Sequence, residues 1–350
     1  MNIIVVGAGA IGCYVAGRLA AAGEQVTLVG RARTIEPIAL NGLSVTDLQG
    51  FKAHVEVSHL ADLSEAHLKI ASDLKQATEY LLKNLVGAAQ PTVVLLCVKG
   101  GATVAAAQEI ADCCPAGTSI VSLQNGVDNV ARIKSVATNM QAFAGMVPYN
   151  VVMKTPSNVH RTTMGKIYIE QSDVTTELVK KFNAAGLMAT TSSDMRSVQW
   201  GKLLLNVNNP VNALSDLPLR EELLSRDFRY VFATLQLEAL KALKAADIEP
   251  VQLAAVKPHV MPYLLKLPNF IFIRVAKKML RMDPTARSSM WDDIQLGRVT
   301  EINDMCGAVA RLAKQVGTKA PCNEAMCELI SGLTKGKSMT GREIRKKLAI

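Results

Sequence analysis

The sequence predicts an α/β domain with a parallel, doubly wound sheet, followed by an all-helical C-terminal domain. In the first half of the chain, short runs rich in Val, Leu and Ile alternate with segments of helical period. This alternation is typical of a parallel sheet covered by crossover helices. From about residue 194 onward, strand signals disappear and helical segments follow one another. We therefore expect a first domain at 1–193, a second at 194–335 and a basic C-terminal tail at 336–350.

The elements of the first domain are read from apolar runs and from helical periodicity. Strands are expected at residues 1–6, 25–29, 43–45, 53–57, 91–98, 119–123, 145–149 and 166–170. Helices are expected at residues 13–19, 64–88, 102–111 and 175–185. The continuous Val and Leu content of 91–98 is typical of a strand that is buried on both faces of a parallel sheet.

A glycine-rich turn lies between the first strand and the first helix. Gly7, Gly9 and Gly12 form a Gly-x-Gly-x-x-Gly pattern directly after an apolar run. In a dinucleotide-binding (Rossmann) domain, these glycines permit a tight turn, a close approach to a pyrophosphate and close helix–strand packing, respectively. The N–H groups at the helix start, including those of Ala10 and Ile11, then face the phosphates. This context predicts a dinucleotide site; the alternative is a glycine-rich turn without a ligand.

The end of the second strand indicates which nicotinamide cofactor binds. An NAD site places an acidic residue about 20 residues after the glycines, where it accepts a hydrogen bond from the ribose 2′-hydroxyl. This chain has Arg31 and Arg33 there instead. A guanidinium suits a 2′-phosphate and can stack on the adenine. We therefore predict NADPH as the cofactor; the alternative is that Arg31 is one surface arginine among many.

Composition excludes several classes of protein. Of the 350 residues, 49% are hydrophobic, which indicates a globular chain and not a disordered one. No apolar run reaches membrane-spanning length, and a cleavable signal is not expected because the chain begins on a strand. The seven cysteines include no Cys-x-x-Cys pair and the five histidines are scattered, so no metal site is predicted. This cysteine usage fits a reducing compartment, and we expect a cytoplasmic protein.

The net charge of +9 is compatible with nucleic-acid binding or with anionic small molecules. Aromatic residues make up only 4%, and no basic helix is interleaved with them, which argues against nucleic acid. Much of the positive excess lies in the last sixteen residues, as in a solvated basic tail. A positive cleft also attracts a phosphorylated dinucleotide and an anionic substrate. We therefore expect small-molecule ligands, no nucleic acid and no membrane.

Polar residues follow two further strands of the predicted sheet. Lys99 comes directly after the strand at 91–98, and Asn125 follows the strand at 119–123. Ligands of doubly wound sheets bind beyond the carboxyl ends of the strands. Taken alone, each residue is equally well a solvated loop residue. Together with the glycine motif, both are expected to lie beside the ligands.

The second domain opens with polar residues inside an apolar helical run. Residues 197–214 contain one lysine and four asparagines, although asparagine is a poor helix former and costly to bury unpaired. Lys202, Asn206 and Asn209 fall at i, i+4 and i+7, so they are expected to share one helical face. One ammonium and two amides suit a substrate carbonyl; the alternative is a polar stripe that lines a domain interface.

Ser289 and Glu301 are expected on one later helical stretch. They are twelve residues apart, which is about three and a third helical turns. One of them then meets the far end of a substrate and the other its reacting end. Spacing alone favours a different interpretation, in which the serine caps a helix and the glutamate is solvated.

These motifs, in this order, resemble the ketopantoate reductase (2-dehydropantoate 2-reductase) family over nearly the whole chain. The residues that carry the resemblance are Gly7, Gly9, Gly12, Arg31, Cys97, Val98, Lys99, Gln124, Asn125, Gly126, Trp200, Lys202, Leu203, Asn206, Ser288, Ser289, Met290, Asp293, Ile294, Thr300, Glu301 and Ile302. The resemblance implies a Rossmann domain, a helical domain and a substrate in the cleft between them. It further implies that NADPH reduces ketopantoate to (R)-pantoate, a step towards pantothenate and coenzyme A.

The resemblance also implies a role for each matching residue. Lys202 corresponds to the general acid that protonates the ketone oxygen. Glu301 corresponds to the acidic residue that contacts the substrate hydroxyl and helps to orient the lysine. Ser289 corresponds to a residue that binds the substrate carboxylate, and Asn206 to a substrate-binding amide. Lys99 and Asn125 correspond to residues that border the nicotinamide and the substrate. Arg31 corresponds to the residue that binds the 2′-phosphate.

Three features depart from the family pattern. The second amide of the family falls eight residues after the lysine, where this chain has Pro210, so Asn209 or Asn212 is expected to replace it. The stretch 60–90 is longer than usual and is a place for an extra helix, and the basic extension after about 335 exceeds the common core.

Three other interpretations stay open. The chain could be a reductase of another branched 2-oxo acid, an enzyme of the 3-hydroxyacid dehydrogenase kind, or a non-catalytic NADPH sensor. Arg31 and the pair Ser289 and Glu301 argue against the second, and the presence of Lys202, Glu301 and Ser289 together argues against the third. A homodimer is a further expectation.

Overall fold

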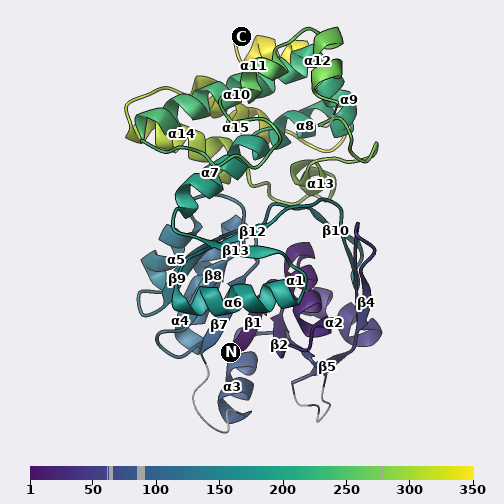
Figure 1. Ribbon diagram of the computed structural model, residues 1–350, viewed down its shortest axis with the longest axis vertical. Coiled ribbons are helices and arrows are strands. Elements are labelled where there is room, and N and C mark those ends of the chain that lie inside the picture. Colours follow the sequence, from purple (N-terminus) through teal and green to yellow (C-terminus); the bar gives the residue numbers. More distant parts are fainter. Residues whose placement is uncertain (61, 63–65, 85–90, 278) are drawn as a thin grey trace. The chain divides into compact units, whose positions relative to one another are not determined.

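A computed structural model of the chain describes all residues except 61, 63–65, 85–90 and 278, and side chains 82–84 (Figure 1). The described residues form two compact units, Met1–Met195 and Arg196–Ile350. The first unit combines two sheets with helices, and the described part of the second is helical throughout. The predicted fold class, a mostly parallel α/β domain followed by a helical domain, is therefore confirmed.

A nine-stranded sheet forms the centre of the first unit. Its strands, in spatial order, are β13 (Ala189–Ser192), β12 (Ile167–Glu170), β9 (Gln141–Met146), β8 (Ser119–Ser122), β7 (Thr92–Leu96), β1 (Asn2–Val6), β2 (Val26–Val29), β6 (Leu68–Ala71) and β5 (Val57–His59). All neighbours pair in parallel except β12 and β9. The chain runs outward from β1 first through β2 and later through β7, so the strand order reverses at β1. In open α/β sheets, such a switch point is where ligands bind.

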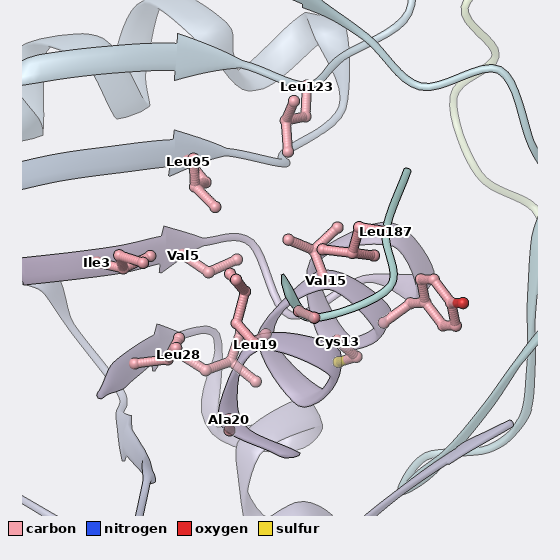
Figure 2. Packing of buried hydrophobic residues seen from close by; sticks show 14 of the residues in the cluster. Ile3, Val5, Cys13, Val15, Leu19, Ala20, Leu28, Leu95, Leu123 and Leu187 are labelled. Atoms are coloured by element: carbon pink, nitrogen blue, oxygen red, sulfur yellow. The ribbon is translucent and has the colours of Figure 1, made fainter. Parts of the chain in front are cut away.

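Helices cover both faces of this sheet. They are α1 (Ala10–Ala21), α2 (Ala32–Asn41), α3 (Leu74–Asn84), α4 (Thr103–Cys113), α5 (Asn129–Val136) and α6 (Asp173–Ala184). Alternate residues of β1 belong to two separate cores: Ile3 and Val5 pack with α1, α2 and α6, whereas Ile4 and Val6 pack with α3, α4 and α5. Figure 2 shows Leu19 of α1 against the sheet residues of the first core.

A second, four-stranded sheet flanks α1 on its other side. Its order is β10 (Val151–Thr155), β11 (Asn158–Arg161), β3 (Leu43–Asp47) and β4 (Lys52–Val55). Gly17 of α1 lies so close to β3 that a Cβ there would clash with Val45. Residues 12–20 of α1 are all buried, because the helix lies between two sheets. This packing explains why α1 is apolar on nearly all sides, with the buried Arg18 paired to Asp47 at 3.0 Å.

The second unit is built around the long helix α10 (Arg226–Ala245). Its other helices are α7 (Met195–Asn206), α8 (Asn209–Ser215), α9 (Leu219–Leu224), α11 (Met261–Leu265), α12 (Asn269–Val275), α13 (Ser289–Gln295), α14 (Cys306–Gln315), α15 (Pro321–Ser331) and α16 (Gly341–Lys347). Of these, α8, α9, α11, α14, α15 and α16 contact α10. In the described part of the chain, no helix has the length and apolar character that crossing a membrane requires.

The helix predicted at 64–88 is wrong in its first part. Leu68–Ala71 is strand β6, paired between β2 and β5, and the helix that follows is α3. All four residues of β6 are buried, so pairing in the sheet decides their structure against a spacing that also fits a helix. Residues 64, 65 and 85–88 of the prediction lie outside the described residues.

The predicted basic tail is solvated on its charged face, but it is in part a packed helix, α16. Helix α16 packs against α10 with Ile344 and Leu348 buried, and Arg345 forms an ion pair with Asp227 at 2.7 Å. A capping box at Thr340 starts the helix. The basic charges on its exposed face are solvated as expected, but the apolar pair at i and i+4 anchors the segment to the second unit.

Candidate active site

The three glycines of the turn after β1 play distinct structural roles. Gly7 has φ +112°, and a Cβ there would lie 2.8 Å from the backbone of Cys97 and Val98. A Cβ on Gly12 would clash with the Gly7 carbonyl oxygen, so this glycine sets the close helix–strand packing. Gly9 is exposed and meets nothing within 4 Å of its would-be Cβ. Of these three glycines, only Gly9 has open space around it, and Gly9 is the glycine that a pyrophosphate would approach.

The start of α1 suits an anion. Gly9 caps the helix without a side chain, and the first turn carries no acidic residue. The first N–H groups of a helix have no partner within the helix, and the helix dipole adds positive character there. Ala10 and Ile11, in this first turn, are half-buried. The residues present therefore fit the phosphates of a dinucleotide.

Arg31 lies directly beside the glycine turn. A Cβ on Gly30 would lie 2.5 Å from the Cβ of Ala8, so the chain after β2 runs along the glycine turn. Arg31 is the N-cap of α2, and its carbonyl accepts a hydrogen bond from the Thr34 hydroxyl at 2.7 Å. Its side chain is exposed. This is the position at which a guanidinium meets a 2′-phosphate.

Lys99 and Asn125 follow the neighbouring parallel strands β7 and β8. Lys99 is exposed at the start of a short 3₁₀ turn, Gly100–Ala102, and Asn125 is half-buried. Leu123 N donates to the Leu96 carbonyl at 2.9 Å, so the sheet pairing extends to the start of both loops. The structure thus places both residues at the carboxyl edge of the sheet, one strand and two strands from the glycine turn.

A buried polar network holds these two loops together. Gln124 donates from one amide nitrogen to the Val98 carbonyl at 2.9 Å and to the Thr103 hydroxyl at 2.7 Å. Asn129 donates to the Asn125 carbonyl at 2.7 Å. Gln124, Thr103 and Asn129 are all buried, and sequence reasoning assigned none of them a role. The signal that could have found them is a cluster of amide and hydroxyl side chains directly after two adjacent strands.

Lys202 and Glu301 interact electrostatically in the second unit. Lys202 lies on α7 one turn before Asn206, and both side chains are half-buried. Burial lowers the pKa of Lys202 to about 8, and the negative charge of Glu301 opposes this shift. Glu301 is itself half-buried, directly before a 3₁₀ turn at Ile302–Asp304. An amine with a pKa near neutrality, next to a carboxylate, suits proton donation.

Asn209 is not on the helix of Lys202, which corrects the predicted shared face. Helix α7 ends at Asn206, and Asn209 begins α8 with Pro210 in its first turn. Proline lacks an N–H and clashes with the preceding turn, so it ends one helix and starts the next. The Asn209 amide nitrogen faces the Met305 sulfur at 3.8 Å, and its carbonyl accepts from the Ser288 hydroxyl at 3.2 Å.

Ser289 and Glu301 are likewise not on one helix. Helix α13 spans Ser289–Gln295, and Gly297 follows it with φ +62°, a left-handed conformation that ends helices. The helix cap is Ser288, whose side chain accepts from Trp291 N at 3.2 Å, so Ser289 is not the cap. The Ser289 side chain is exposed at the helix start.

The Asn212 side chain is turned into the protein, which disfavours it as the second substrate amide. It is fully buried, and its amide nitrogen donates to the Leu217 carbonyl at 2.9 Å and to Glu222 at 2.8 Å. Its carbonyl oxygen accepts from Ser288 N at 2.8 Å. Both hydrogens and the oxygen are therefore engaged within the protein, and Asn209 is the remaining candidate.

In the described part of the chain, no group of three or more His, Cys, Asp or Glu side chains is arranged to hold a metal ion.

Family models match both units of the chain. Residues 3–173 match the model described as ketopantoate reductase PanE/ApbA, and residues 194–334 match the model of its C-terminal part. The chain belongs to the ketopantoate reductase family. Relatives named 2-dehydropantoate 2-reductase include one from Pyrococcus horikoshii, 26% identical over 97% of this chain and 99% of the relative. Another, from Mesorhizobium japonicum, is 26% identical over 95% of this chain and 98% of its own length.

Solved structures agree with this membership in the ketopantoate reductase family. A PanE/ApbA family ketopantoate reductase from Ralstonia eutropha aligns over 100% of both chains with a TM-score of 0.75 and 25% identity. A D-mandelate dehydrogenase in complex with NADH and anilino(oxo)acetate aligns with a TM-score of 0.72, again over 100% of both chains. At 20% identity, the dehydrogenase shows a shared fold alone.

Membership confirms the expected family and the expected class of enzyme, an oxidoreductase. Enzymes of the ketopantoate reductase family use NADPH, in agreement with the cofactor predicted from Arg31. The roles of individual residues, by contrast, stay predictions.

Proposed function

We propose that this protein uses NADPH to reduce ketopantoate, a branched 2-oxo acid, to (R)-pantoate. The observation that carries the proposal is the pair formed by Lys202 and Glu301 in a member of the ketopantoate reductase family. A non-catalytic sensor has no use for an amine whose pKa is held near neutrality beside a carboxylate. An oxidoreductase that makes an alcohol from a ketone needs such a proton donor.

The cofactor would be held by residues around β1 and β2. The turn from Gly7 to Gly12 would hold the pyrophosphate, and Arg31 would pair with the 2′-phosphate. Lys99 and Asn125, at the next two strand ends, would border the nicotinamide and the substrate. When bound, NADPH supplies a hydride.

Lys202 would donate the proton that completes the reduction. As the ketone carbon gains a hydride, its oxygen becomes an alkoxide that needs positive charge and then a proton. The Lys202 ammonium supplies both, and a pKa of about 8 makes the proton easier to release than that of an ordinary lysine. Glu301 keeps the amine protonated at neutral pH, because its negative charge favours the ammonium.

The rest of the substrate would be held by polar groups of the second unit. We assign the substrate carboxylate to the exposed Ser289 hydroxyl and the Asn209 amide, with the Asn206 amide near the ketone. Glu301 would accept a hydrogen bond from the substrate hydroxyl. A site built to pair with that hydroxyl rejects analogues that lack it, because its own buried group is left unpaired.

Initial rates on a panel of 2-oxo acids test this proposal. NADPH oxidation is followed at saturating cofactor with ketopantoate, with 2-oxoisovalerate, which lacks the hydroxyl, and with phenylglyoxylate, which is aromatic. We expect the highest kcat/KM with ketopantoate, and the product is checked as the (R) enantiomer by chiral chromatography. Faster turnover of phenylglyoxylate would assign the substrate pocket to aromatic acids instead. No turnover with any of the three would reject the reductase function.

We further propose a homodimer in a reducing, cytoplasmic setting. All seven cysteines are free thiols, which fits reducing conditions. Tyr263 on α11 is 65% exposed and Phe270 on α12 is 76% exposed, which is compatible with a surface that binds a partner. Light scattering coupled to size exclusion would measure the mass, and a monomer at micromolar concentration would argue against the dimer.

A further inference from the structure

Glu222 is a buried acidic residue that the proposed reaction does not use. It lies on α9 and is 0% exposed. Its Oε2 atom accepts a hydrogen bond from the Asn212 amide at 2.8 Å, and its buried Oε1 atom has no hydrogen-bond partner in the part of the chain that the structure describes. None of the ion pairs among the described residues includes Glu222. A buried acid without a cation is expensive to keep, so its retention calls for a reason beyond packing.

Glu222 functions as a neutral hydrogen-bonding group near neutral pH. Burial raises the pKa of Glu222 to about 8, and the hydrogen bond from Asn212 only partly opposes the rise. The carboxyl is thus mostly protonated at pH 7. A glutamine has the same shape and also offers one carbonyl oxygen to Asn212.

Three hydrogen bonds connect Glu222 to the backbone of the residues that we assign to the substrate. Glu222 fixes the Asn212 amide, and the Asn212 oxygen accepts from Ser288 N at 2.8 Å. The Ser288 hydroxyl in turn donates to the Asn209 carbonyl at 3.2 Å. The chain of contacts therefore ends on the backbone of Asn209 and on the residue before Ser289.

We propose that Glu222 is a positioning residue that fixes the backbone carrying Asn209 and Ser289 through the Asn212 amide. The inference rests on the proposed function, in which these two residues bind the substrate carboxylate. Glu222 itself touches neither substrate nor cofactor. It sets the angle at which the two substrate ligands are presented.

Other contacts keep α13 attached when this network is lost. The Trp291 indole donates to Asp216 at 2.6 Å, and Leu219 N donates to the Ala286 carbonyl at 2.8 Å. Breaking the Glu222–Asn212 bond should therefore loosen the orientation of Ser289 without releasing the helix. A loosened ligand raises the KM of the substrate, whereas proton transfer from Lys202 and binding of NADPH are unaffected.

Two substitutions at Glu222 separate hydrogen bonding from packing. Glu222→Met keeps the volume and the helix propensity but removes the acceptor, and Glu222→Gln keeps the acceptor. Glu221→Met is the matched control, because Glu221 is an exposed acid on the same helix. We expect Glu222→Met to raise the KM for ketopantoate about tenfold, the effect of leaving one buried amide hydrogen unpaired. Glu222→Gln and Glu221→Met should stay within about twofold of wild type, and kcat and the KM for NADPH should stay within about twofold in all three.

Asn212→Leu breaks the same connection from the other side. It should raise the KM for ketopantoate at least as much as Glu222→Met, and the double variant should add nothing further. This variant also keeps the inference testable if Glu222→Met does not fold. If the double variant raised the KM by the product of the two single effects, the two residues would act separately. That result would overturn the proposal that Glu222 acts through Asn212.

The outcomes distinguish this inference from the proposed function. If wild type reduces ketopantoate, but Glu222→Met lowers only the melting temperature, Glu222 is structural and the positioning role is rejected while the function stands. An equal rise of the KM for ketopantoate in Glu222→Gln and Glu222→Met would also reject the positioning role, because keeping the hydrogen-bond acceptor would then not preserve the KM. If wild type prefers another 2-oxo acid, the named substrate fails and the KM comparison is made with that acid. If wild type turns over none of these acids, both are rejected.

Discussion

The proton donor assigned to Lys202 predicts an unusual alkaline limb in the pH profile. An ordinary lysine has a pKa of 10.5, whereas burial lowers that of Lys202 to about 8. The protonated fraction is then about 90% at pH 7 and about 10% at pH 9. For ketone reduction, kcat/KM should therefore fall about tenfold over this interval. For the reverse oxidation of pantoate, the neutral amine is the competent form, so the rate should rise over the same interval.

The charge of Glu301 predicts the direction in which the pKa of Lys202 moves when that charge is removed. Its carboxylate favours the ammonium and so raises the pKa of Lys202 against the effect of burial. Removing that charge in Glu301→Gln should move the alkaline limb to lower pH. Lys202→Arg should lose most of its activity and its alkaline limb together, since a guanidinium remains protonated and releases its proton poorly. Lys202→Ala should lower kcat about 10²–10⁴-fold, the usual contribution of a general acid.

The assay is kcat/KM for ketopantoate from pH 6 to 10 in a buffer of constant ionic strength, with the melting temperature recorded at each pH. The melting temperature is recorded because unfolding at high pH would also lower kcat/KM and would look like the titration of a catalytic group. A wild-type profile that stays flat up to about pH 9.5, as for an ordinary lysine with a pKa of 10.5, would refute the reasoning, and so would an upward shift of the limb in Glu301→Gln. So would a Lys202→Ala variant that keeps most of its kcat at saturating substrate.

Three further predictions address the cofactor and the substrate. Arg31→Ala should lose about 1.5–3 kcal/mol of NADPH recognition, or about 10- to 150-fold in kcat/KM, and leave NADH almost unchanged; equal use of both cofactors by wild type would contradict this. Gly12→Ala should lower the melting temperature because its Cβ meets the Gly7 carbonyl, whereas Gly9→Ala should keep the melting temperature and weaken NADPH binding measured by fluorescence titration. Glu301→Ala should narrow the preference for ketopantoate over 2-oxoisovalerate, and an unchanged ratio of kcat/KM values would remove Glu301 from hydroxyl recognition.

The cofactor half of the site could be predicted because its signals are local or follow from parallel pairing. The strand, the glycine turn and the helix start are consecutive in sequence, and the structure keeps them in that order. Lys99 and Asn125 are 26 residues apart, yet both follow parallel strands, and parallel strands end at the same edge of a sheet. Sequence period and topology together thus bring them to one edge without any knowledge of side-chain packing.

Tertiary contacts override local period where an element is short. Leu68, Ala71 and Leu74 have helical spacing, but the first two lie in β6 and the third begins α3. A four-residue strand offers too few positions for alternation to show, and its burial between β2 and β5 is decided by distant residues. The packing of the C-terminal segment was not predicted for a related reason, since two apolar residues, Ile344 and Leu348, among many lysines and arginines are enough to anchor α16.

The substrate half was predicted at its ends but not in its middle. The family pattern predicts Ser289 and leaves Asn209 or Asn212 as the second amide. Pro210 and Gly297 mark in the sequence the places where the two expected helices break. Glu222, however, follows another glutamate on a six-residue helix, and nothing local distinguishes the two. Packing against α8 and α10 buries one and exposes the other. Motifs therefore predict groups that would touch ligands, whereas a buried acid such as Glu222 becomes a candidate only when the fold has decided which polar side chains lie inside.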